Sequence, residues 1–416
     1  MAHGGRFMTA MVVDALGSGV WITFSLLYFT YGQGLALTAA GAALSTGALT
    51  ALVLGGLAVG VLTDRMGPFR AATLSCAIRA VAFPCYLFAD RPATVAVIAF
   101  AVSFGDRLYW AAHGGLVESV TSGEQARRSL FALLNSLRNV GLGLGALTVA
   151  LGAWLEESAG APLWNSIPLV NAGSFAVAGL LFHRVGRNAR PVAAPEPGRR
   201  AVSYRGVLAN RPFVVFTGAT LTLTLSSVAF DSILPVYLRS LDLPLWLPPV
   251  VYVLSCVAIP AFQPLALRLG RDRHAMRLMA LAAVLVAVAL GGLATLGPLG
   301  PAGATALIGL LVLVFSLGEA IFGAVAMTVV LSYATPTDAG RYSAFYQLAW
   351  GLSGALGPGI HTLLFSVSGS APWIAMAAAL LGGAAVYLRL ARTAHAPQKP
   401  TSYSRAPAGR KGRTRP

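Results

Sequence analysis

Long apolar runs separated by short polar segments recur along the chain from residue 8 to about residue 392. A helix that crosses the hydrocarbon core of a bilayer needs roughly 20 apolar residues, which these runs provide. Because unpaired backbone polar groups are costly in lipid, such runs are expected to be helical. The pattern predicts twelve membrane helices, over residues 8–31, 38–62, 71–89, 93–120, 130–154, 164–184, 210–238, 246–268, 275–296, 303–331, 341–367 and 371–392.

The composition supports this interpretation. Hydrophobic residues make up 56% of the 416 residues and charged residues only 11%, and the mean hydropathy is +0.72. A soluble protein of this length could not bury so much apolar surface. The sequence also lacks the alternating pattern typical of an outer-membrane barrel. We therefore predict an all-α polytopic membrane protein.

Arginines gather in every second predicted loop, and the net charge is +16. The positive-inside rule then places both termini and the long central loop in the cytoplasm. This distribution favours a membrane surface and not a nucleic acid as the partner of the basic residues. The preference for Arg over Lys, with abundant Ala and Gly, is typical of a bacterial protein. We expect a bacterial inner (plasma) membrane.

Two halves are predicted, because the segment 187–208 is rich in Pro, Ala and Arg and has no apolar period. Arg-x-Gly followed by Arg occurs in the second loop of each half, at 65–70 and at 268–273. Parallel repeats of six helices, with a binding site between them, are typical of rocking secondary transporters. The expected organisation is an N-terminal bundle over 1–186, a cytoplasmic linker over 187–208, a C-terminal bundle over 209–393 and a disordered basic tail over 394–416.

The loop after the second predicted helix is the most informative motif in the chain. It reads Gly60-Val61-Leu62-Thr63-Asp64-Arg65-Met66-Gly67-Pro68-Phe69-Arg70. With Gly60, Leu62, Asp64, Arg65, Gly67 and Arg70, it resembles the loop signature of the major facilitator superfamily. Over residues 8–392 the chain is similar to the bacterial twelve-helix drug:proton antiporters of that superfamily. The resemblance implies the major facilitator fold, with two pseudo-symmetric six-helix bundles.

The resemblance also implies a gate at the cytoplasmic surface. In the family, the Asp of this loop caps the start of helix 11 and locks the outward-facing state. Carried over, Asp64 would face the helix that begins near 341–344, where the helix dipole favours an anion. Glu118, at the end of the fourth helix, would then pair with Arg65 or Arg70. Phe69 stands where the family usually has a basic residue.

Two further family signatures are incomplete. Arg107 matches the fourth-helix arginine of proton-coupled members, but the glycine that normally follows it is absent. Gly141 and Gly145 match the fifth-helix antiporter signature, but its Pro and final glycines are missing, and Gly357 with Pro358 echoes it in helix 11. Such glycines fit either a conformational gate or ordinary packing of small residues.

Ionisable residues inside the predicted spans are candidate functional groups, because each costs on the order of 2.5–3.5 kcal/mol at the centre of a membrane helix. The predicted proton-coupling group consists of Asp14, Asp106, Arg107, Asp231 and Glu319. Carboxyls in an apolar, intermittently wet cavity could alternate between neutral and ionised forms. The alternative is a set of fixed ion pairs that specify packing. Asp14 and Arg138, at similar depth, could form one such pair, and Arg79 is expected to be structural.

Aromatic residues are frequent on helices expected to line the cavity, namely Trp21, Phe24, Tyr28, Tyr109, Trp110, Phe230, Tyr346 and Trp350. Aromatic walls with few polar anchors suit hydrophobic or cationic molecules, although packing or interfacial belts could also explain them. The predicted function is therefore alternating-access transport, with proton-coupled efflux of such compounds by multidrug-type antiport. The expected partners are a small-molecule substrate, protons and the lipid bilayer, with no cofactor or metal, and we expect a monomer.

Two alternatives remain open. Within transporters, the chain could be a proton-coupled symporter for a small metabolite. The alternative from another class is a polytopic membrane enzyme, which would need paired carboxylates or clustered histidines in a loop. The longest loop offers only Glu196 among arginines, so we predict no enzymatic activity. The sequence also lacks the phosphate-binding loop of a primary pump and the filter of a channel.

Overall fold

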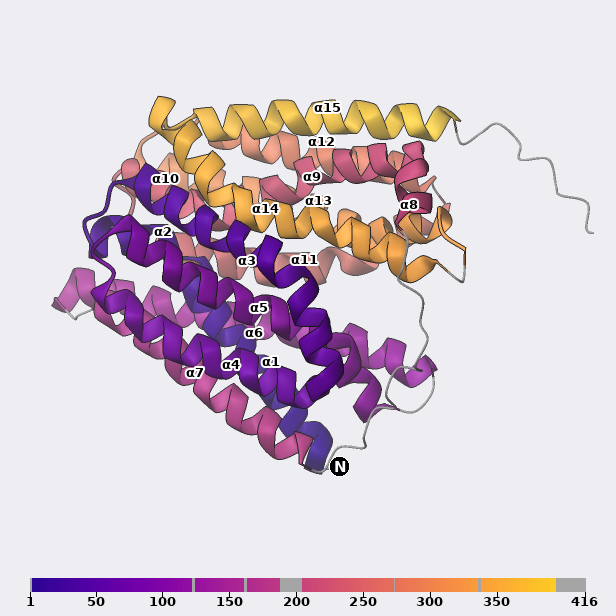
Figure 1. Ribbon diagram of the computed structural model, residues 1–416. Helices are drawn as coiled ribbons and strands as arrows, with labels where there is room; N and C mark the ends of the chain where they lie inside the picture. The colour runs from indigo at the N-terminus through magenta and orange to yellow at the C-terminus, as the bar shows by residue number, and fades with distance from the viewer. Residues whose placement is uncertain are drawn as a thin grey trace, which may run out of the picture.

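The computed structural model describes residues 2–121, 124–160, 163–187, 204–272, 274–335 and 338–393. Helices account for nearly all of these residues, and there is no strand within the described ranges. Figure 1 shows the helices lying side by side in two groups, with the N-terminal group (indigo to magenta) below the C-terminal group (rose to yellow). We call these groups the N half and the C half. The prediction of an all-α fold with two bundles is confirmed.

The N half contains six long helical segments. Its elements are α1 (Ala2–Ile22), the short α2 (Ser25–Leu27) with the π-helical turn η1 (Tyr28–Gly32), α3 (Leu37–Met66), α4 (Pro68–Cys85) with the 3-10 turn η2 (Tyr86–Phe88), α5 (Pro92–Val120), α6 (Glu124–Ala159) and α7 (Leu163–Gly186).

The C half repeats this plan after a short surface helix. Its elements are α8 (Arg205–Ala209), α9 (Arg211–Ser232) with α10 (Leu234–Ser240), α11 (Leu247–Asp272), α12 (Ala275–Leu293), α13 (Pro301–Ser332), α14 (Ala339–Val367) and α15 (Ala371–Thr393). Each of the twelve predicted spans therefore coincides with a helix or a bent helix pair. The largest differences in a boundary are at α1 and α6, each of which begins six residues earlier than predicted.

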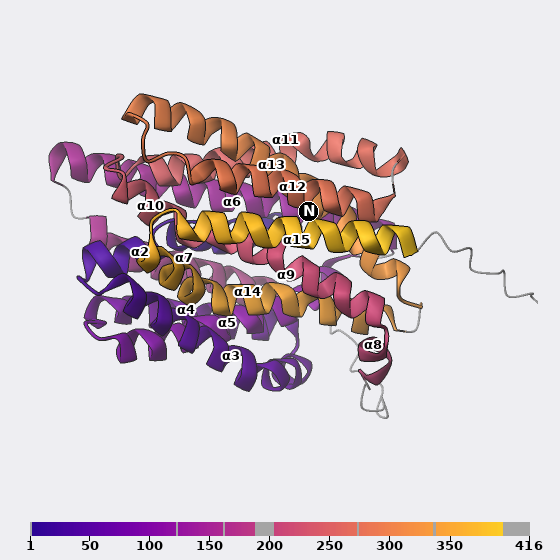
Figure 2. The ribbon, with the colours of Figure 1, turned by 90° about the horizontal axis from the view of Figure 1, so that it is seen from above.

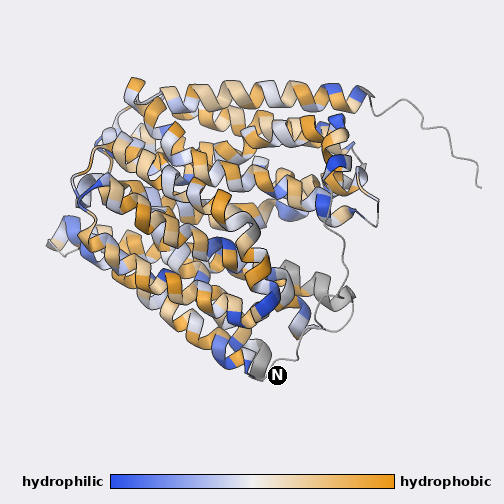
Figure 3. Ribbon diagram, viewed as in Figure 1, coloured by the Kyte–Doolittle hydropathy of each residue, from blue (hydrophilic) through white to orange (hydrophobic). Residues whose placement is uncertain are grey.

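Ten described helices are long and apolar enough to cross a membrane, and the bent pair Gly5–Ile22 with Ser25–Gly32 can count as an eleventh. The remaining long helix is α14, which has 29 residues. It carries Gln347, Ser353 and His361 along its length, which lowers its hydropathy. Figure 3 shows hydrophilic residues gathered at both ends of the helices and hydrophobic residues along most of their lengths. The protein is thus a multi-pass membrane protein.

Two predicted spans are bent instead of straight. The first bends by 51° between Ile22 and Ser25. There the hydroxyl of Thr23 donates to the carbonyl of Gly19 at 3.1 Å, a back-bond that tends to bend helices. The seventh divides at Ile233, between α9 and α10, where Pro235 supplies no amide for the helical ladder.

Charge defines the two ends of the bundle. The basic end carries the exposed arginines Arg65, Arg70, Arg184, Arg268 and Arg277, and the opposite end carries Asp90, Glu157 and Asp242. At the basic end, Gly67 has φ +80°, a conformation that favours glycine, and this lets α3 pass directly into α4. Figure 1 shows α3 and α14 lying side by side toward the opposite end and diverging toward the basic end.

The two halves pack along two seams, α3 against α14 and α6 against α11. In Figure 2, which views the molecule from above, α6 and α11 of the second seam lie next to each other. In the first seam a Cβ added at Gly41 would lie 2.7 Å from the Pro358 carbonyl oxygen, so the backbones approach closely. The Gly359 amide donates to the Ser45 hydroxyl at 2.8 Å. Between the loops, the Leu245 amide donates to the Glu157 carboxylate at 2.8 Å. These contacts join the halves at the opposite end.

Two predicted segments lie mainly or wholly outside the described residues. Of the expected linker over 187–208, the structure describes only Arg187 and the residues from Tyr204 onward. Residues 205–208 belong to α8, so a helix stands where the sequence predicted irregular chain. The expected tail over 394–416 lies outside the described residues.

The close approach at Gly41 leads to a test of the α3–α14 seam. Gly41→Val should force α3 away from α14 and increase the separation of the halves at the opposite end, because Pro358 and Thr362 leave no space for a side chain. Spin labels at Asp90→Cys and Ser240→Cys, with exposed Cys85 replaced by Ser, would report that separation. Gly56→Val on the same helix is the matched control, since its Cβ would meet nothing within 4 Å. Equal distance distributions for the two variants would refute the seam.

Candidate functional site

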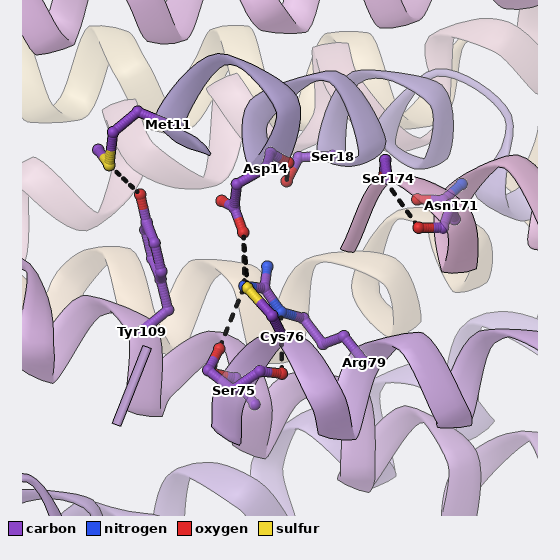
Figure 4. Close-up of polar contacts among 10 residues, drawn as sticks. Met11, Asp14, Ser18, Ser75, Cys76, Arg79, Tyr109, Asn171 and Ser174 are labelled. Carbon is purple, nitrogen blue, oxygen red and sulfur yellow. Dashed lines mark hydrogen bonds and ion pairs between the residues drawn. The ribbon is translucent and has the colours of Figure 1, made fainter. Parts of the chain in front are cut away.

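A buried ion pair lies at the centre of the N half. Arg79 on α4 donates from Nη2 to Asp14 Oδ1 on α1 at 2.6 Å, and the two side chains are 2% and 7% exposed. Arg79 also donates to the Ser75 hydroxyl at 3.1 Å, and its guanidinium lies 4.0 Å from the centre of the Phe175 ring. Figure 4 shows Asp14 pointing down from α1 toward Arg79, with Ser75 and Cys76 beside it. Asp14 therefore pairs with Arg79 and not with Arg138, and the structural role expected for Arg79 agrees with this geometry.

Asp106 lies on a different face of the N half. It is exposed and stands one turn before Trp110, which is 45% exposed, on α5. Farther along α5, Gly114 and Glu118 are exposed at the same four-residue spacing. Residues four positions apart lie on the same face of a helix. The exposed face of α5 therefore runs from mid-membrane at Asp106 to the basic end at Glu118.

Arg138 on α6 stands between this face and the C half. Its guanidinium lies 5.2 Å from the centre of the Trp110 ring, within the range of a cation–π contact. It interacts electrostatically with Asp106 on α5 and with Asp231 on α9 of the C half. Because Arg138 lies within electrostatic range of both carboxylates, this face of α5 is directed toward the C half.

The C half contributes two carboxylates to the same central region. Asp231 stands one turn after Ser227 on α9, and the Ser227 hydroxyl donates to Glu319 Oε1 on α13 at 2.9 Å. Glu319 interacts electrostatically with Asp231 and with Tyr346 on α14. Within the described part of the chain, Asp106, Asp231 and Glu319 form no ion pair within 4 Å, whereas Asp14 does. The structure thus brings Asp231 and Glu319 together, and Arg138 connects Asp231 with Asp106.

Arg107 points in another direction from Asp106. It interacts electrostatically with Asp106, and its Nη2 would lie 3.3 Å from a Cβ at Gly351 on α14. Its Nε has no hydrogen-bond partner among the residues that the structure describes. Arg107 therefore reaches from the N half to the α3–α14 seam, and it does not contact Asp231 or Glu319.

Three of the predicted cavity aromatics pack together inside the N half. Phe24 and Tyr28 have no exposed surface, and the Tyr28 hydroxyl donates to the Tyr86 carbonyl at 3.0 Å. Trp21 stacks on Tyr86 with ring centres 5.0 Å apart. The bend after Ile22 turns these rings into the core of the half, so in this conformation they do not line the space between the halves.

The other predicted aromatics divide into buried and exposed rings. Tyr109 and Tyr346 are each 5% exposed, and Phe230 stacks on Phe315 with ring centres 4.2 Å apart. Trp110 and Trp350 are 45% and 37% exposed. These two tryptophans therefore offer the largest free aromatic surfaces of the predicted set.

In the described part of the chain, no side-chain hydrogen bond or ion pair joins the predicted gate loop to α14 in this conformation. Asp64, Arg65, Arg70 and Glu118 are exposed, and none of their side chains has a hydrogen bond or ion pair to a described residue. The expected capping of α14 by Asp64 is absent here because α3 and α14 diverge toward the basic end. A Cβ added at Gly60 would also meet no other residue within 4 Å. The gating role of this loop stays a prediction.

The predicted gate glycines lie at tight contacts between helices. A Cβ at Gly141 would lie 2.6 Å from the Val12 carbonyl oxygen, and one at Gly145 would lie 2.8 Å from the Val20 amide, so both pack α6 against α1. Gly357 packs α14 against Val228 on α9. Pro358 lies at the seam with α3, as described above.

Comparison with known proteins identifies the family. The family model of the Major Facilitator Superfamily matches residues 7–358, most of the chain. The chain belongs to the Major Facilitator Superfamily. It is therefore a membrane transporter, and the predictions of a transporter and of this fold are confirmed. A comparison with curated protein sequences found no match.

Solved structures of the superfamily share the fold at low identity. An auto-inhibited peptide transporter of the POT family has a TM-score of 0.75 at 13% identity, covering 98% of this chain and 99% of its own. A bacterial homologue of the iron transporter ferroportin, in an inward-facing state, has a TM-score of 0.75 at 14% identity, covering 94% and 98%. A mutant of the nucleoside transporter NupG has a TM-score of 0.74 at 13% identity, covering 93% and 98%. These likenesses concern the fold alone.

Two residues of this superfamily member's central region were not predicted as functional. Arg138 was considered only as a partner for Asp14, and Ser227 was not singled out. A sequence signal existed for Ser227, because it stands four residues before Asp231 and so shares its helix face. No sequence signal places Arg138 beside Asp231, because 93 residues separate them.

The Asp14–Arg79 pair provides a stability test. Asp14→Asn leaves a buried guanidinium without its counter-charge, so it should reduce the free energy of unfolding by about 3–5 kcal/mol. Unfolding by titration with sodium dodecyl sulfate would measure this loss. The double variant Asp14→Asn/Arg79→Met should recover most of it, since no unpaired charge remains. The control Asp90→Asn, at an exposed carboxylate, should leave the unfolding free energy unchanged. Wild-type stability of Asp14→Asn would rule out a stabilising pair.

Proposed function

We propose that this transporter couples the export of hydrophobic or cationic small molecules to proton entry by alternating access. The observation that supports this most strongly is the set of acids between the halves. Asp106, Asp231 and Glu319 lie at membrane depth without an ion pair in the described part of the chain, whereas Asp14 is paired. An unpaired carboxylate at this depth is costly, and protonation removes the cost.

The arrangement of the halves supports alternating access. The seams join the halves at the opposite end, and the helices diverge toward the basic end. By the positive-inside rule we assign the basic end to the cytoplasm of a bacterial inner membrane. On this assignment the conformation is open toward the cytoplasm. The exposed face of α5 then leads from the cytoplasm to Asp106, which gives substrate and protons a route inward.

The chemistry of the central region supports a cationic or hydrophobic substrate. Asp231 and Glu319 of the C half interact with each other, Arg138 connects Asp231 with Asp106 of the N half, and the exposed predicted tryptophans are Trp110 and Trp350. Aromatic faces attract organic cations, and their area suits apolar molecules. A cationic substrate and a proton would compete for the same carboxylates, and such competition is a direct means of coupling antiport. We propose a monomeric carrier, since each half-to-half interface lies within one chain.

The coupling role can be tested in reconstituted vesicles with an imposed pH gradient and the lipophilic cation tetraphenylphosphonium as a probe substrate. Asp106→Asn, Asp231→Asn and Glu319→Gln each remove one proton site. Loss of an essential site should reduce uphill transport at least tenfold while leaving downhill exchange measurable, because exchange needs no net proton movement. Asp242→Asn, an exposed acid at the opposite end, is the control. Undiminished uphill transport in all three variants would exclude these acids from coupling.

The gate loop yields a separate test, which needs no substrate. If Asp64 caps α14 only in the outward-facing state, Asp64→Asn should destabilise that state and leave the conformation described here unaffected. The population open at the basic end should therefore increase. Electron-spin distances between labels at Ser119→Cys on α5 and Ser332→Cys on α13, in the Cys85→Ser background, would measure it. Asp90→Asn is the matched control at the other surface. An unchanged population in Asp64→Asn would contradict the gating assignment.

A further inference from the structure

Arg138 is the guanidinium that interacts with carboxylates of both halves. It projects from α6 of the N half, is partly buried, and holds its position over the Trp110 ring. Asp106 interacts with it from α5, and Asp231 interacts with it from α9 across the interface. In the described ranges it forms no ion pair within 4 Å, so it is committed to neither carboxylate.

We propose that Arg138 is a shared counter-ion that positions the two halves, held between Asp106 and Asp231 when both are ionised and kept by the remaining carboxylate when one takes a proton. This inference rests on the proposed function and adds a positioning residue to it. Whether Asp106 or Asp231 takes the proton would then decide which half retains the Arg138 guanidinium. A proton on Asp231 would loosen the attachment of Arg138 to the C half, and deprotonation would restore it.

The energetics of a partly buried cation give this arrangement a limit. If both Asp106 and Asp231 were protonated, the guanidinium would lose both counter-charges while partly shielded from water, which is unfavourable. The pair should therefore take up one proton at a time. No covalent step is involved, because the proton passes between water and a carboxylate oxygen. Glu319 interacts with Asp231 and accepts from Ser227, so it forms a second proton site beyond the guanidinium.

The other two buried arginines cannot take this part. Arg79 is already paired with Asp14 inside the N half, and although it also interacts with Asp106, it does not interact with Asp231. Arg107 interacts with Asp106 but reaches toward Gly351 on α14, away from Asp231. An anion-binding role for Arg138 is also disfavoured, because carboxylates flank it on two sides and would repel an anionic substrate.

Every titratable group that interacts with Arg138 bears on the test. On the elements that pack around it, these groups are Asp106, Tyr109 and His113 on α5, Asp231 on α9, and Tyr252 and Cys256 on α11. Asp14 on α1 acts on Tyr109 and His113 from the other side. Among the groups that interact with Arg138 directly, only Asp106, Asp231 and His113 titrate below pH 8 in ordinary surroundings. The experiment must therefore separate the aspartates from His113.

The test follows the conformation of the full chain in lipid nanodiscs without substrate, over pH 4 to 9. Labels at Ser119→Cys and Ser332→Cys in the Cys85→Ser background report the separation of the halves at the basic end. Arg138→Gln should raise the midpoint pH of the conformational change by about one unit, about a tenfold change in proton affinity, because the lost cation favours protonated carboxyls. Arg138→Lys should stay closer to wild type. The exposed Arg91→Gln is the control with the same loss of charge.

Combined variants decide between the groups. In the Asp106→Asn/Asp231→Asn background, Arg138→Gln should produce no further shift because neither carboxylate partner remains, and this triple variant also removes the uncompensated charges that could impair folding of the single variant. An unchanged midpoint in Arg138→Gln would overturn the proposal. So would a shift that persists in both Asp106→Asn and Asp231→Asn but disappears in His113→Gln. These outcomes differ from failure of the proposed function, which would appear as wild-type vesicles that show no proton-driven transport.

Discussion

The cost of holding a charge in an apolar interior divides the ionisable residues of this protein into two groups. Asp14 and Arg79 meet this cost by direct pairing, supported by Ser75 and by the Phe175 ring, inside one half. Asp106, Asp231 and Glu319 do not pair directly among the described residues, and they stand where the two halves face each other. Pairing within a half makes that half rigid. On the proposed mechanism, the charges left uncommitted between the halves make the relative position of the halves depend on what neutralises them.

Rigid halves and a responsive interface are what a rocking carrier requires. Within the N half, α6 packs on α1 through Gly141 and Gly145, and the aromatic cluster of Trp21, Tyr28 and Tyr86 fills its end. At the α3–α14 seam the contacts are different in kind, because they include small residues, hydroxyls and a main-chain amide. Such contacts at this seam can separate without leaving a large apolar surface exposed.

Much of the fold could be predicted from the sequence, because bilayer thickness fixes the length of each apolar run. The bend after Ile22 could not be predicted. It depends on a hydroxyl back-bond at Thr23, and such back-bonds also occur in helices that do not bend. That bend also explains why Phe24 and Tyr28 pack within the N half and not along the interface. The membrane acids were visible as charges in apolar runs. Their partners were not, because Arg79 and Asp14 are 65 residues apart and only tertiary packing brings them together.

The two ends of the interface differ in chemistry, and this has a consequence for the surrounding electrolyte. Among the described residues, the contacts at Gly41, Ser45 and Gly359 of the α3–α14 seam involve no formal charge, and Glu157 is the charged residue that accepts from the Leu245 amide between the loops at that end. The loop around Asp64 at the basic end is densely charged. Dissolved ions screen exposed charges over about 10 Å at 0.1 M ionic strength. Salt in the medium should therefore act mainly on the contacts at the basic end of the carrier and have little effect on the α3–α14 seam at the opposite end.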